Sequence, residues 1–262
     1  MKIYILTDME GISGVWRPEQ VQKGNSEYEK ARKFLCEDVN SAIAGAFDGG
    51  ATEVVVLDGH GGGDNFILEI MDERAIYETV KNSLEVMPSL NETFGGLIQV
   101  GCHAMAGTLN GFLDHTQSSA SWFNFYVNGK KFGEIEQAGA YAGAFSVPVI
   151  MVTGDKAACE EAYGFFGDIE LVSVKEGLGR NKAKCIAPRL AHKMIHDAAV
   201  RAVRRAKSGE FKPFILKEPI EMKLELCRSD YADEYATRPG VERLDARTVR
   251  KIIRSAKEIY YW

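Results

Sequence analysis

The sequence has no long hydrophobic run and no surplus of basic residues. Although 45% of its 262 residues are hydrophobic, no uninterrupted apolar stretch approaches the roughly 20 residues that a membrane-spanning helix needs. The 32 lysines and arginines are outnumbered by 37 aspartates and glutamates, which gives a net charge of -5. Nucleic-acid-binding proteins usually carry a clustered basic surface. We therefore expect neither nucleic acid nor a membrane as partner, but a small molecule or a peptide.

The cysteines are few, and none lies close to another in the sequence. The chain has 5 cysteines without a Cys-x-x-Cys pair, and an odd number cannot be fully paired within one chain. A reducing compartment follows, and the absence of a signal-peptide pattern at the N-terminus predicts the cytoplasm. Cys102 adjoins His103 and is open to interpretation as a nucleophile or ligand. A small buried residue is the favoured interpretation, because neighbours on a strand face opposite sides.

Three strand-like apolar runs stop abruptly at residues with metal-binding side chains. A helical pattern that begins at a capping sequence, Ser26 to Glu29, joins the first run to the second, so these strands form a parallel βαβ unit. The carboxyl ends of parallel strands meet at one edge of a sheet, where open α/β proteins bind their ligands. The side chains expected at this edge are Asp8 and Glu10 after the first run, His60 after the second and His103 after the third.

Mixed carboxylate and imidazole clusters are typical of divalent first-row metals, above all zinc. Asp8 and Glu10 project to the same side of an extended chain and repel each other unless a positive charge lies between them. The alternative for this stretch is an acidic loop at a sheet edge, since short motifs are weak indicators. The histidines at two further strand ends favour a metal site, and they favour zinc over magnesium.

The other segments predict a three-layer α/β/α fold with a mostly parallel central sheet. Buried strands are expected over residues 147–152 and 170–174, and a long helix over residues 188–208. A less regular segment fits either an extended stretch over residues 75–80 or a short helix after Asn82.

The end of the chain has a different pattern. Residues 220–226 alternate between apolar and polar side chains, which is typical of a half-exposed strand, and residues 245–257 predict a helix. We therefore predict a metal-binding catalytic domain over residues 1–212. A smaller α+β lobe over residues 213–262 is expected to pack on it.

The pair Asn128-Gly129 between two strand-like runs predicts a two-residue β-hairpin. In that register Glu134 lies on the returning strand, on the same face as Glu136. From the pattern alone, Glu134 is a solvated residue of an edge strand. His115 lies in a loop rich in small residues and, again from the pattern alone, is a surface histidine.

Six segments together carry a family resemblance that spans nearly the whole chain. They are Asp8-Met-Glu10-Gly-Ile-Ser-Gly14, Asp58-Gly-His60-Gly, Gly101-Cys-His103-Ala104, His115-Thr116, Gly133-Glu134-Ile135 and Val147-Pro-Val-Ile-Met-Val-Thr-Gly-Asp155. The sequence resembles the D-aminopeptidase family of binuclear zinc peptidases. The resemblance implies two zinc ions per subunit and a homo-oligomer, such as a decameric ring. The zinc ligands that it implies are Asp8, Glu10, His60, His103 and Glu134, with His115 as the catalytic residue.

The function implied by this resemblance is removal of the N-terminal residue from short peptides, including peptides that contain D-amino acids. A metal-activated water would attack, and His115 would act as acid or base. The chain departs from the family at Glu136 and Ala138, where glycine and asparagine are usual. The free amino terminus of the substrate could bind a metal or an acidic side chain, and Glu136 is a candidate for that side chain. The alternatives are a metal-dependent phosphoesterase and a non-catalytic peptide-binding protein associated with transport.

Overall fold

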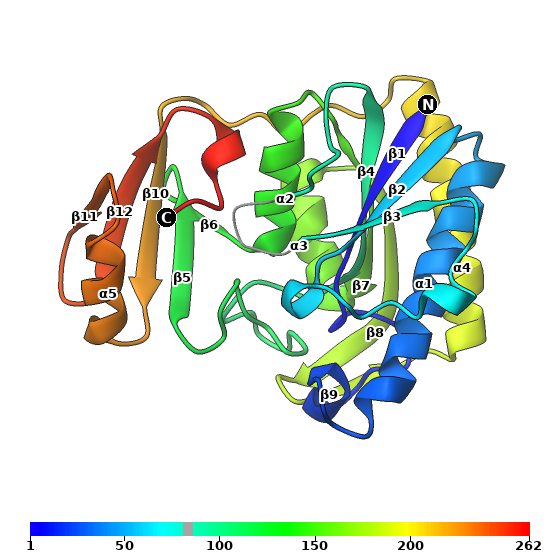
Figure 1. Ribbon diagram of the computed structural model, residues 1–262, viewed down its shortest axis with the longest axis horizontal. Helices are drawn as coiled ribbons and strands as arrows, with labels where there is room; N and C mark the ends of the chain where they lie inside the picture. The colour runs from blue at the N-terminus through cyan, green and yellow to red at the C-terminus, as the bar shows by residue number, and fades with distance from the viewer. Residues whose placement is uncertain (81–85) are drawn as a thin grey trace.

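The computed structural model describes residues 1–80 and 86–262, which form two β-sheets with helices around them (Figure 1). The larger sheet contains, in order across it, β3 (Ile76–Thr79), β2 (Glu53–Asp58), β1 (Lys2–Thr7), β4 (Phe94–Cys102), β7 (Val149–Asp155), β8 (Glu170–Gly179) and β9 (Lys182–Cys185). Its strands are parallel to their neighbours except for β9. The smaller sheet is antiparallel and contains, in order, β11 (Val241–Arg243), β12 (Thr248–Ile253), β10 (Ile220–Leu226), β5 (Trp122–Val127) and β6 (Lys130–Phe132).

Helices cover both faces of the larger sheet (Figure 1). On one face α1 (Tyr28–Asp48) packs against α4 (Pro188–Lys207). On the other face α2 (Glu134–Gly143) and α3 (Lys156–Phe166) lie between the two sheets, and α5 (Ser229–Ala236) lies beside the smaller sheet. Short 3-10 turns are η1 (Pro18–Val21), η2 (His60–Gly62), η3 (Leu68–Ile70) and η4 (Ala256–Glu258). The predicted three-layer α/β/α fold with a mostly parallel central sheet is confirmed.

The strand β1 anchors the hydrophobic cores on both sides of the larger sheet. Ile3 and Ile5 are fully buried in the cluster that includes α1 and α4. Tyr4 is fully buried in the cluster that includes α2 and the smaller sheet. Alternate side chains of a strand face opposite sides, so one central strand fixes the position of its own carboxyl end against both layers.

The structure confirms most of the predicted elements and shifts some of their ends. The strand β1 pairs in parallel with both β2 and β4, as the βαβ prediction requires. The helix α1 begins one residue after Glu27, and neither Ser26 nor Glu27 caps it through a side chain, so the predicted capping box is wrong. The extended stretch predicted over residues 75–80 contains β3, whereas the helix predicted after Asn82 falls largely on residues 81–85, which lie outside the described residues.

The helix predicted over residues 245–257 is wrong. Residues Thr248–Ile253 form β12, which pairs with β10 so that Ile253 lies opposite Ile220. Val249 and Ile253 are both buried, and their spacing of four residues imitates a helical period. The segment is rich in β-branched side chains, and its pairing with β10 decides its conformation.

The smaller sheet joins distant parts of the chain. Its hairpin β5–β6 turns at Asn128 and Gly129, whose φ angles of 49° and 79° are those of the predicted two-residue turn. The other strands of this sheet come from residues after 213, so the smaller sheet draws on both sides of the predicted boundary. The division into residues 1–212 and 213–262 stays a prediction.

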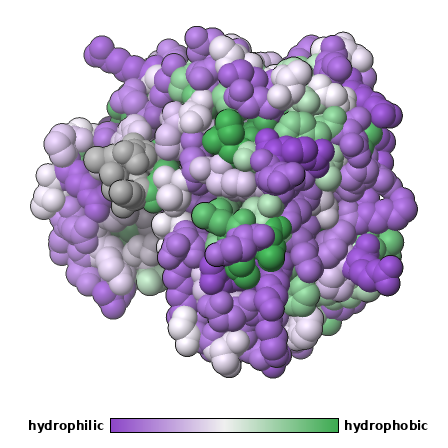
Figure 2. Space-filling view, turned by 45° about the vertical axis from the view of Figure 1, so that its right-hand side comes forward, coloured by the Kyte–Doolittle hydropathy of each residue, from purple (hydrophilic) through white to green (hydrophobic). Residues whose placement is uncertain are grey.

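The surface agrees with the composition. The face in Figure 2 is mostly hydrophilic, with groups of hydrophobic residues between hydrophilic ones. No helix in the described part of the chain is long and apolar enough to cross a membrane.

Candidate metal centre

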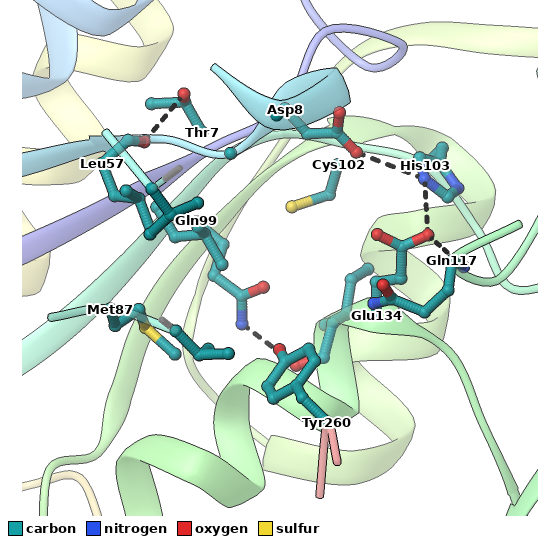
Figure 3. Close-up of a pocket in the computed structure, with 16 residues that line it drawn as sticks. Thr7, Asp8, Leu57, Met87, Gln99, Cys102, His103, Gln117, Glu134 and Tyr260 are labelled. Carbon is teal, nitrogen blue, oxygen red and sulfur yellow. Dashed lines mark hydrogen bonds and ion pairs between the residues drawn. The ribbon is translucent and has the colours of Figure 1, made fainter. Parts of the chain in front are cut away.

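The predicted ligands meet at the carboxyl ends of three neighbouring strands. Asp8 follows β1, His60 follows β2, and His103 follows β4. Figure 3 shows Asp8 and His103 facing each other, with Glu134 below them in the lining of a pocket. The topology thus brings together side chains that are far apart in the sequence.

Asp8 lies between two histidines and turns one carboxylate oxygen toward each. Its Oδ1 is 3.0 Å from His60 Nδ1, and its Oδ2 is 3.2 Å from His103 Nε2. Glu10 Oε2 is 3.1 Å from the same His60 nitrogen, and Glu134 Oε1 is 3.5 Å from His103 Nε2. The cluster therefore has a His60 half (Asp8, Glu10 and His60) and a His103 half (Asp8, His103 and Glu134), which share Asp8.

The loop that carries Glu10 is held tightly against its surroundings. A Cβ atom on Gly11 would lie 2.0 Å from the carbonyl oxygen of Cys102, so only glycine permits this approach to β4. From β8 the buried Lys175 Nζ donates hydrogen bonds to the carbonyl oxygens of Glu10, at 2.5 Å, and Val15, at 2.7 Å. Nothing in the local sequence around Lys175 indicates this role, because its partners are more than 150 residues away.

A buried amide fixes the turn that carries His60. The Asn65 side chain donates hydrogen bonds to Asp58 Oδ1 and to the His60 carbonyl oxygen, both at 2.7 Å. Its backbone N–H donates to Asp58 Oδ2 at 2.6 Å, and the Tyr28 hydroxyl donates to Asn65 Oδ1 at 2.5 Å. Asn65 is completely buried, so these bonds are shielded from water. They hold the glycine-rich turn after β2 in one conformation.

Backbone carbonyl groups orient the three histidine rings. His60 Nε2 lies 3.1 Å from the carbonyl oxygen of Val21, and His103 Nδ1 lies 3.0 Å from that of Ala104. His115 Nδ1 lies 2.8 Å from the carbonyl oxygen of Leu113. Each of these nitrogens therefore carries a proton and donates a hydrogen bond to the carbonyl oxygen. The opposite nitrogen of each ring faces the carboxylates, and in the neutral ring it would offer its lone pair to a metal ion.

The donor atoms fit a metal ion. Glu10 Oε2 and His103 Nε2 are buried and make no hydrogen bond with good geometry, although buried polar atoms normally have a partner. One oxygen or nitrogen from each of Asp8, Glu10 and His103 lies within 4.8 Å of the others, and the same holds for His103, His115 and Glu134. Oxygen and imidazole ligands without a thiolate suit zinc or a similar divalent ion.

The electrostatics of the cluster without metal also indicate a cation site. Burial would raise the pKa of Asp8, but its ion-pair contacts with His103 and His60 outweigh burial and hold that pKa well below its usual range. Burial would lower the pKa of His60, but the charge of Glu10 and the hydrogen bond with Asp8 raise it to about 11. Ion-pair contacts with Asp8 and Glu134 likewise outweigh burial and raise the pKa of His103 well above its usual value. Protons on the histidines thus neutralise carboxylates that a bound cation would neutralise instead.

Glu134 reaches the cluster by a different route from the predicted one. The strand β6 ends at Phe132, and Glu134 is the first residue of α2, so its expected place on the returning hairpin strand is wrong. Gly133 has an extended conformation and caps the helix, and the Glu136 carboxylate accepts the Gly133 N–H at 2.6 Å. The capping interaction ends the hairpin and turns Glu134 toward His103.

Glu136 does not face the pocket. It is completely buried, and burial together with the nearby charge of Glu161 raises its pKa well above the usual value. Glu161 Oε2 accepts the N–H of Met105 at 2.8 Å. Glu136 is therefore part of a carboxyl pair with Glu161, and its expected role in binding the amino group of a substrate is wrong. The family departure at Ala138 is also fully buried.

His115 lies beside the His103 half. Its ring stacks on that of His103 with a centroid separation of 3.9 Å and an interplanar angle of 11°. His115 Nε2 is 3.7 Å from Glu134 Oε1, and the side chain is 19% exposed, compared with 2% for His103. This position suits a group that contacts both the cluster and an incoming substrate.

A pocket of about 480 Å³ opens beside the His103 half (Figure 3). Most of its wall is apolar and comes from the strand ends, from α2 and from the C-terminal segment. Cys102 is buried as predicted, but it lines this pocket instead of pointing away from the site. Burial raises the pKa of its thiol well above the usual value, so it is a poor nucleophile.

The chain is similar to proteins of known activity over most of its length. The chain is 32% identical over 244 residues to a D-aminopeptidase from Bacillus subtilis (strain 168), a match that covers 92% of this chain and 87% of the relative. Its structure is similar to that of the Zn-dependent D-aminopeptidase DppA from Bacillus subtilis, a self-compartmentalizing protease. That similarity has a TM-score of 0.94 at 29% identity and covers 99% of this chain and 94% of the other.

The sequence profile of the D-aminopeptidase family matches residues 1–262, which is the whole chain. The protein therefore belongs to the D-aminopeptidase family of metallo-aminopeptidases.

Proposed function

We propose that this protein is an aminopeptidase that binds two zinc ions per subunit and removes the N-terminal residue from short peptides, including peptides with D-amino acids. The family and the zinc-dependent structural relative support zinc and the substrate class. The observation that carries the two-ion proposal is the placement of Asp8, whose two oxygens face different histidines. A carboxylate in that position can bridge two cations.

The proposed ligands follow the two halves of the cluster. His60 Nδ1 and Glu10 Oε2 would hold one ion, His103 Nε2 and Glu134 Oε1 would hold the other, and Asp8 would contact both. A zinc pair supplies Lewis acidity for the scissile carbonyl and an acidified water for the attack. Lys175 and Asn65 keep the backbone of the ligand loops in place, as outer hydrogen bonds commonly do around metal sites.

His115 would carry the proton during hydrolysis. Its Nδ1 donates to the Leu113 carbonyl oxygen, so Nε2 is free to accept a proton from water and to pass one to the leaving amine. Its larger exposure than that of His103 favours this role over that of a buried ligand.

The self-compartmentalizing structural relative supports a homo-oligomer for this chain. A decameric ring is the assembly that we propose, and light scattering on purified protein would measure its mass. A monomeric mass would contradict it. The cytoplasmic location stays a prediction.

One preparation suffices to test the proposed function. Metal analysis should give two zinc ions per chain, and hydrolysis of D-alanyl-D-alanine should disappear on chelation and return with added zinc. Full peptidase activity in metal-free protein would contradict the proposal. Assaying p-nitrophenyl phosphate on the same preparation tests the phosphoesterase alternative, which the family does not favour. A protein that binds peptides without cleaving them would match the other alternative.

A further inference from the structure

The walls of the pocket beside the metal centre are made of apolar side chains from separate parts of the fold. Leu6 and Leu57 come from the ends of β1 and β2, and Ile135 comes from the first turn of α2. Met87 comes from the segment before β4, and Tyr260 comes from the C-terminal segment after η4. In Figure 3 Met87 and Tyr260 lie on the side of the pocket opposite Asp8 and His103. An extended substrate with its peptide bond at the cluster would therefore direct one side chain between these walls.

The volume is larger than a small side chain requires. An apolar protein cavity of roughly 150 Å³ is enough to hold a benzene molecule. The pocket measures about 480 Å³, so it has room for the peptide group beside the metal centre and for a side chain as large as leucine or phenylalanine. An alanine methyl group would leave most of the apolar wall in contact with water.

The far end of the pocket is polar but uncharged. Gln99 on β4 is 2% exposed, and its amide Nε2 donates a hydrogen bond to the Ile135 carbonyl oxygen at 3.2 Å. Figure 3 shows its carbonyl oxygen turned toward the interior of the pocket. The charged residues among the described lining side chains all belong to the metal centre: Asp8, His103 and Glu134. Outside the metal centre, a charged substrate side chain would thus lose its water without gaining a partner of opposite charge among the described lining residues.

We infer that this pocket selects peptides whose N-terminal residue has a large apolar side chain, such as leucine, methionine or phenylalanine. The inference rests on the proposed function, because it assigns the pocket to the residue that the aminopeptidase removes. Burial of the additional methylene groups against the pocket walls provides the selectivity, and each methylene group typically changes kcat/KM by 10- to 200-fold in such sites.

The test compares dipeptides that differ only in the first residue. Zinc-loaded enzyme is assayed with Ala-Gly, Leu-Gly, Phe-Gly and Asn-Gly, each with the first residue in the L and in the D form. In the preferred enantiomer, kcat/KM for leucine should exceed that for alanine by at least about tenfold. It should also exceed that for asparagine, which has nearly the same shape as leucine, because the amide must be desolvated.

A matched pair of variants tests whether the Tyr260 ring forms the pocket wall that contacts the substrate side chain. Tyr260 is anchored by an edge-to-face contact with Tyr141, at a centroid separation of 6.0 Å, and is remote from the proposed ligands in the sequence. Tyr260→Ala should lower the ratio of kcat/KM for Leu-Gly to kcat/KM for Ala-Gly by about tenfold or more. Tyr260→Phe keeps the ring and should retain the parental preference. Zinc content of both variants is measured to show that the metal centre is intact.

The outcomes separate this inference from the proposed function. Cleavage of Ala-Gly at least as efficiently as Leu-Gly and Phe-Gly would overturn the inference and leave the aminopeptidase function standing. An equal loss on all substrates in Tyr260→Ala would overturn the role of this wall. Absence of hydrolysis for every peptide, with zinc bound, would overturn the proposed function and the inference together.

Discussion

The two halves of the candidate metal centre come from different kinds of structure. In the His60 half, Asp8, Glu10 and His60 all follow the ends of adjacent parallel strands. In the His103 half, Glu134 comes from the first turn of α2, which lies on another layer. The contacts of His60 measure 3.0 and 3.1 Å, whereas Glu134 lies 3.5 Å from His103. The first half depends on strand order alone, and the second depends also on where a helix begins.

The halves also differ in the groups that support them. The turn with His60 is held by the neutral side chain of Asn65. The chain segments with His103 and Glu134 are held by the carboxyl pair, because Glu161 binds the Met105 N–H and Glu136 binds the Gly133 N–H. An amide does not titrate near neutral pH, but a carboxyl pair does. We therefore expect the two halves to respond differently to substitution and to pH.

The largest effect is expected from the residue that the halves share. Asp8→Asn removes the charge that faces both histidines, so both zinc ions should be lost together with activity. The loss should exceed the 10- to 100-fold that is typical for residues outside the ligand shell. His60→Ala should instead remove one ion and leave the other. Metal analysis after dialysis, together with kcat/KM, measures both. The control is Asp64→Asn, an exposed residue of the next turn. One tightly bound zinc ion in Asp8→Asn would show that Asp8 does not bridge.

The next effect separates chemistry from metal binding. His115→Ala should retain two zinc ions and lower kcat by about 10²- to 10⁴-fold, which is the usual contribution of a general acid or base. Zinc content and steady-state kinetics are measured on the same sample. His192→Ala, which changes a histidine of α4 paired with Asp38, serves as the control. Loss of one zinc ion in His115→Ala would make this histidine a ligand of the His103 half.

The difference between the halves explains which part of the site the sequence could predict. The β-strand runs, the crossover helix and the rule for strand ends are local patterns, and they place Asp8, Glu10, His60 and His103 at one edge. No local pattern placed Glu134, because the capping contact of Glu136 with the Gly133 N–H decides that a helix begins there. The family resemblance implies Glu134 as a zinc ligand, and the structure places its Oε1 3.5 Å from His103 Nε2, although the predicted hairpin strand is wrong.

The fold likewise could be predicted only where local sequence patterns decide it. The parallel sheet was predictable because its buried runs alternate with a helix of regular period. The strand β12 was mistaken for a helix because Val249 and Ile253 are both buried four residues apart, and only the partner strand β10 shows otherwise. The supporting contacts of Lys175 and Asn65 have no sequence signal, since each side chain acts through tertiary hydrogen bonds. Contacts of that kind require the structure.

A smaller effect should follow from removing the Asn65 side chain, which supports the His60 half. Asn65→Ala removes the hydrogen bonds to Asp58 and to the His60 carbonyl oxygen, and it leaves the Tyr28 hydroxyl without its acceptor. Affinity for one zinc ion should fall about 10- to 100-fold, with the other ion bound at parental affinity. The unfolding free energy should fall by roughly 1–3 kcal/mol.

Zinc titration with a chromophoric chelator, together with urea unfolding, measures both quantities. The matched control is Asn40→Ala, which removes the tether from α1 to Ile70 and Asp72 away from the cluster. The control should lose stability without losing zinc affinity. Equal weakening of both zinc ions in Asn65→Ala would contradict the separate support of the two halves.

The smallest effect concerns the pH response of the carboxyl pair of Glu136 and Glu161, which supports the His103 half. Burial raises the pKa of Glu161 from an ordinary 4.5 to about 7 in the folded protein. Between these values the folded state binds more protons than the unfolded state, so the contribution to stability is fully present below about pH 4.5 and is lost as the pH rises toward 7. Glu161→Gln keeps the acceptor for the Met105 N–H and removes the titration. It should therefore stabilise the metal-free protein at pH 8 by on the order of 1 kcal/mol, and less at pH 5.

Urea unfolding of both metal-free proteins at the two pH values checks this, because the titrations outside the carboxyl pair are common to both proteins and cancel in the difference. Glu160→Gln is the matched control. Glu160 is the exposed residue next to Glu161, and it makes a 4.0 Å ion pair with Lys156. The control should show little change at either pH. The carboxyl pair ties the segment after His103 to the start of α2, so a pH-dependent gain in Glu161→Gln alone would locate the pH sensitivity in the His103 half. An equal difference at pH 5 and pH 8 would show that Glu161 does not titrate between them, and the contrast between the two supports would fail.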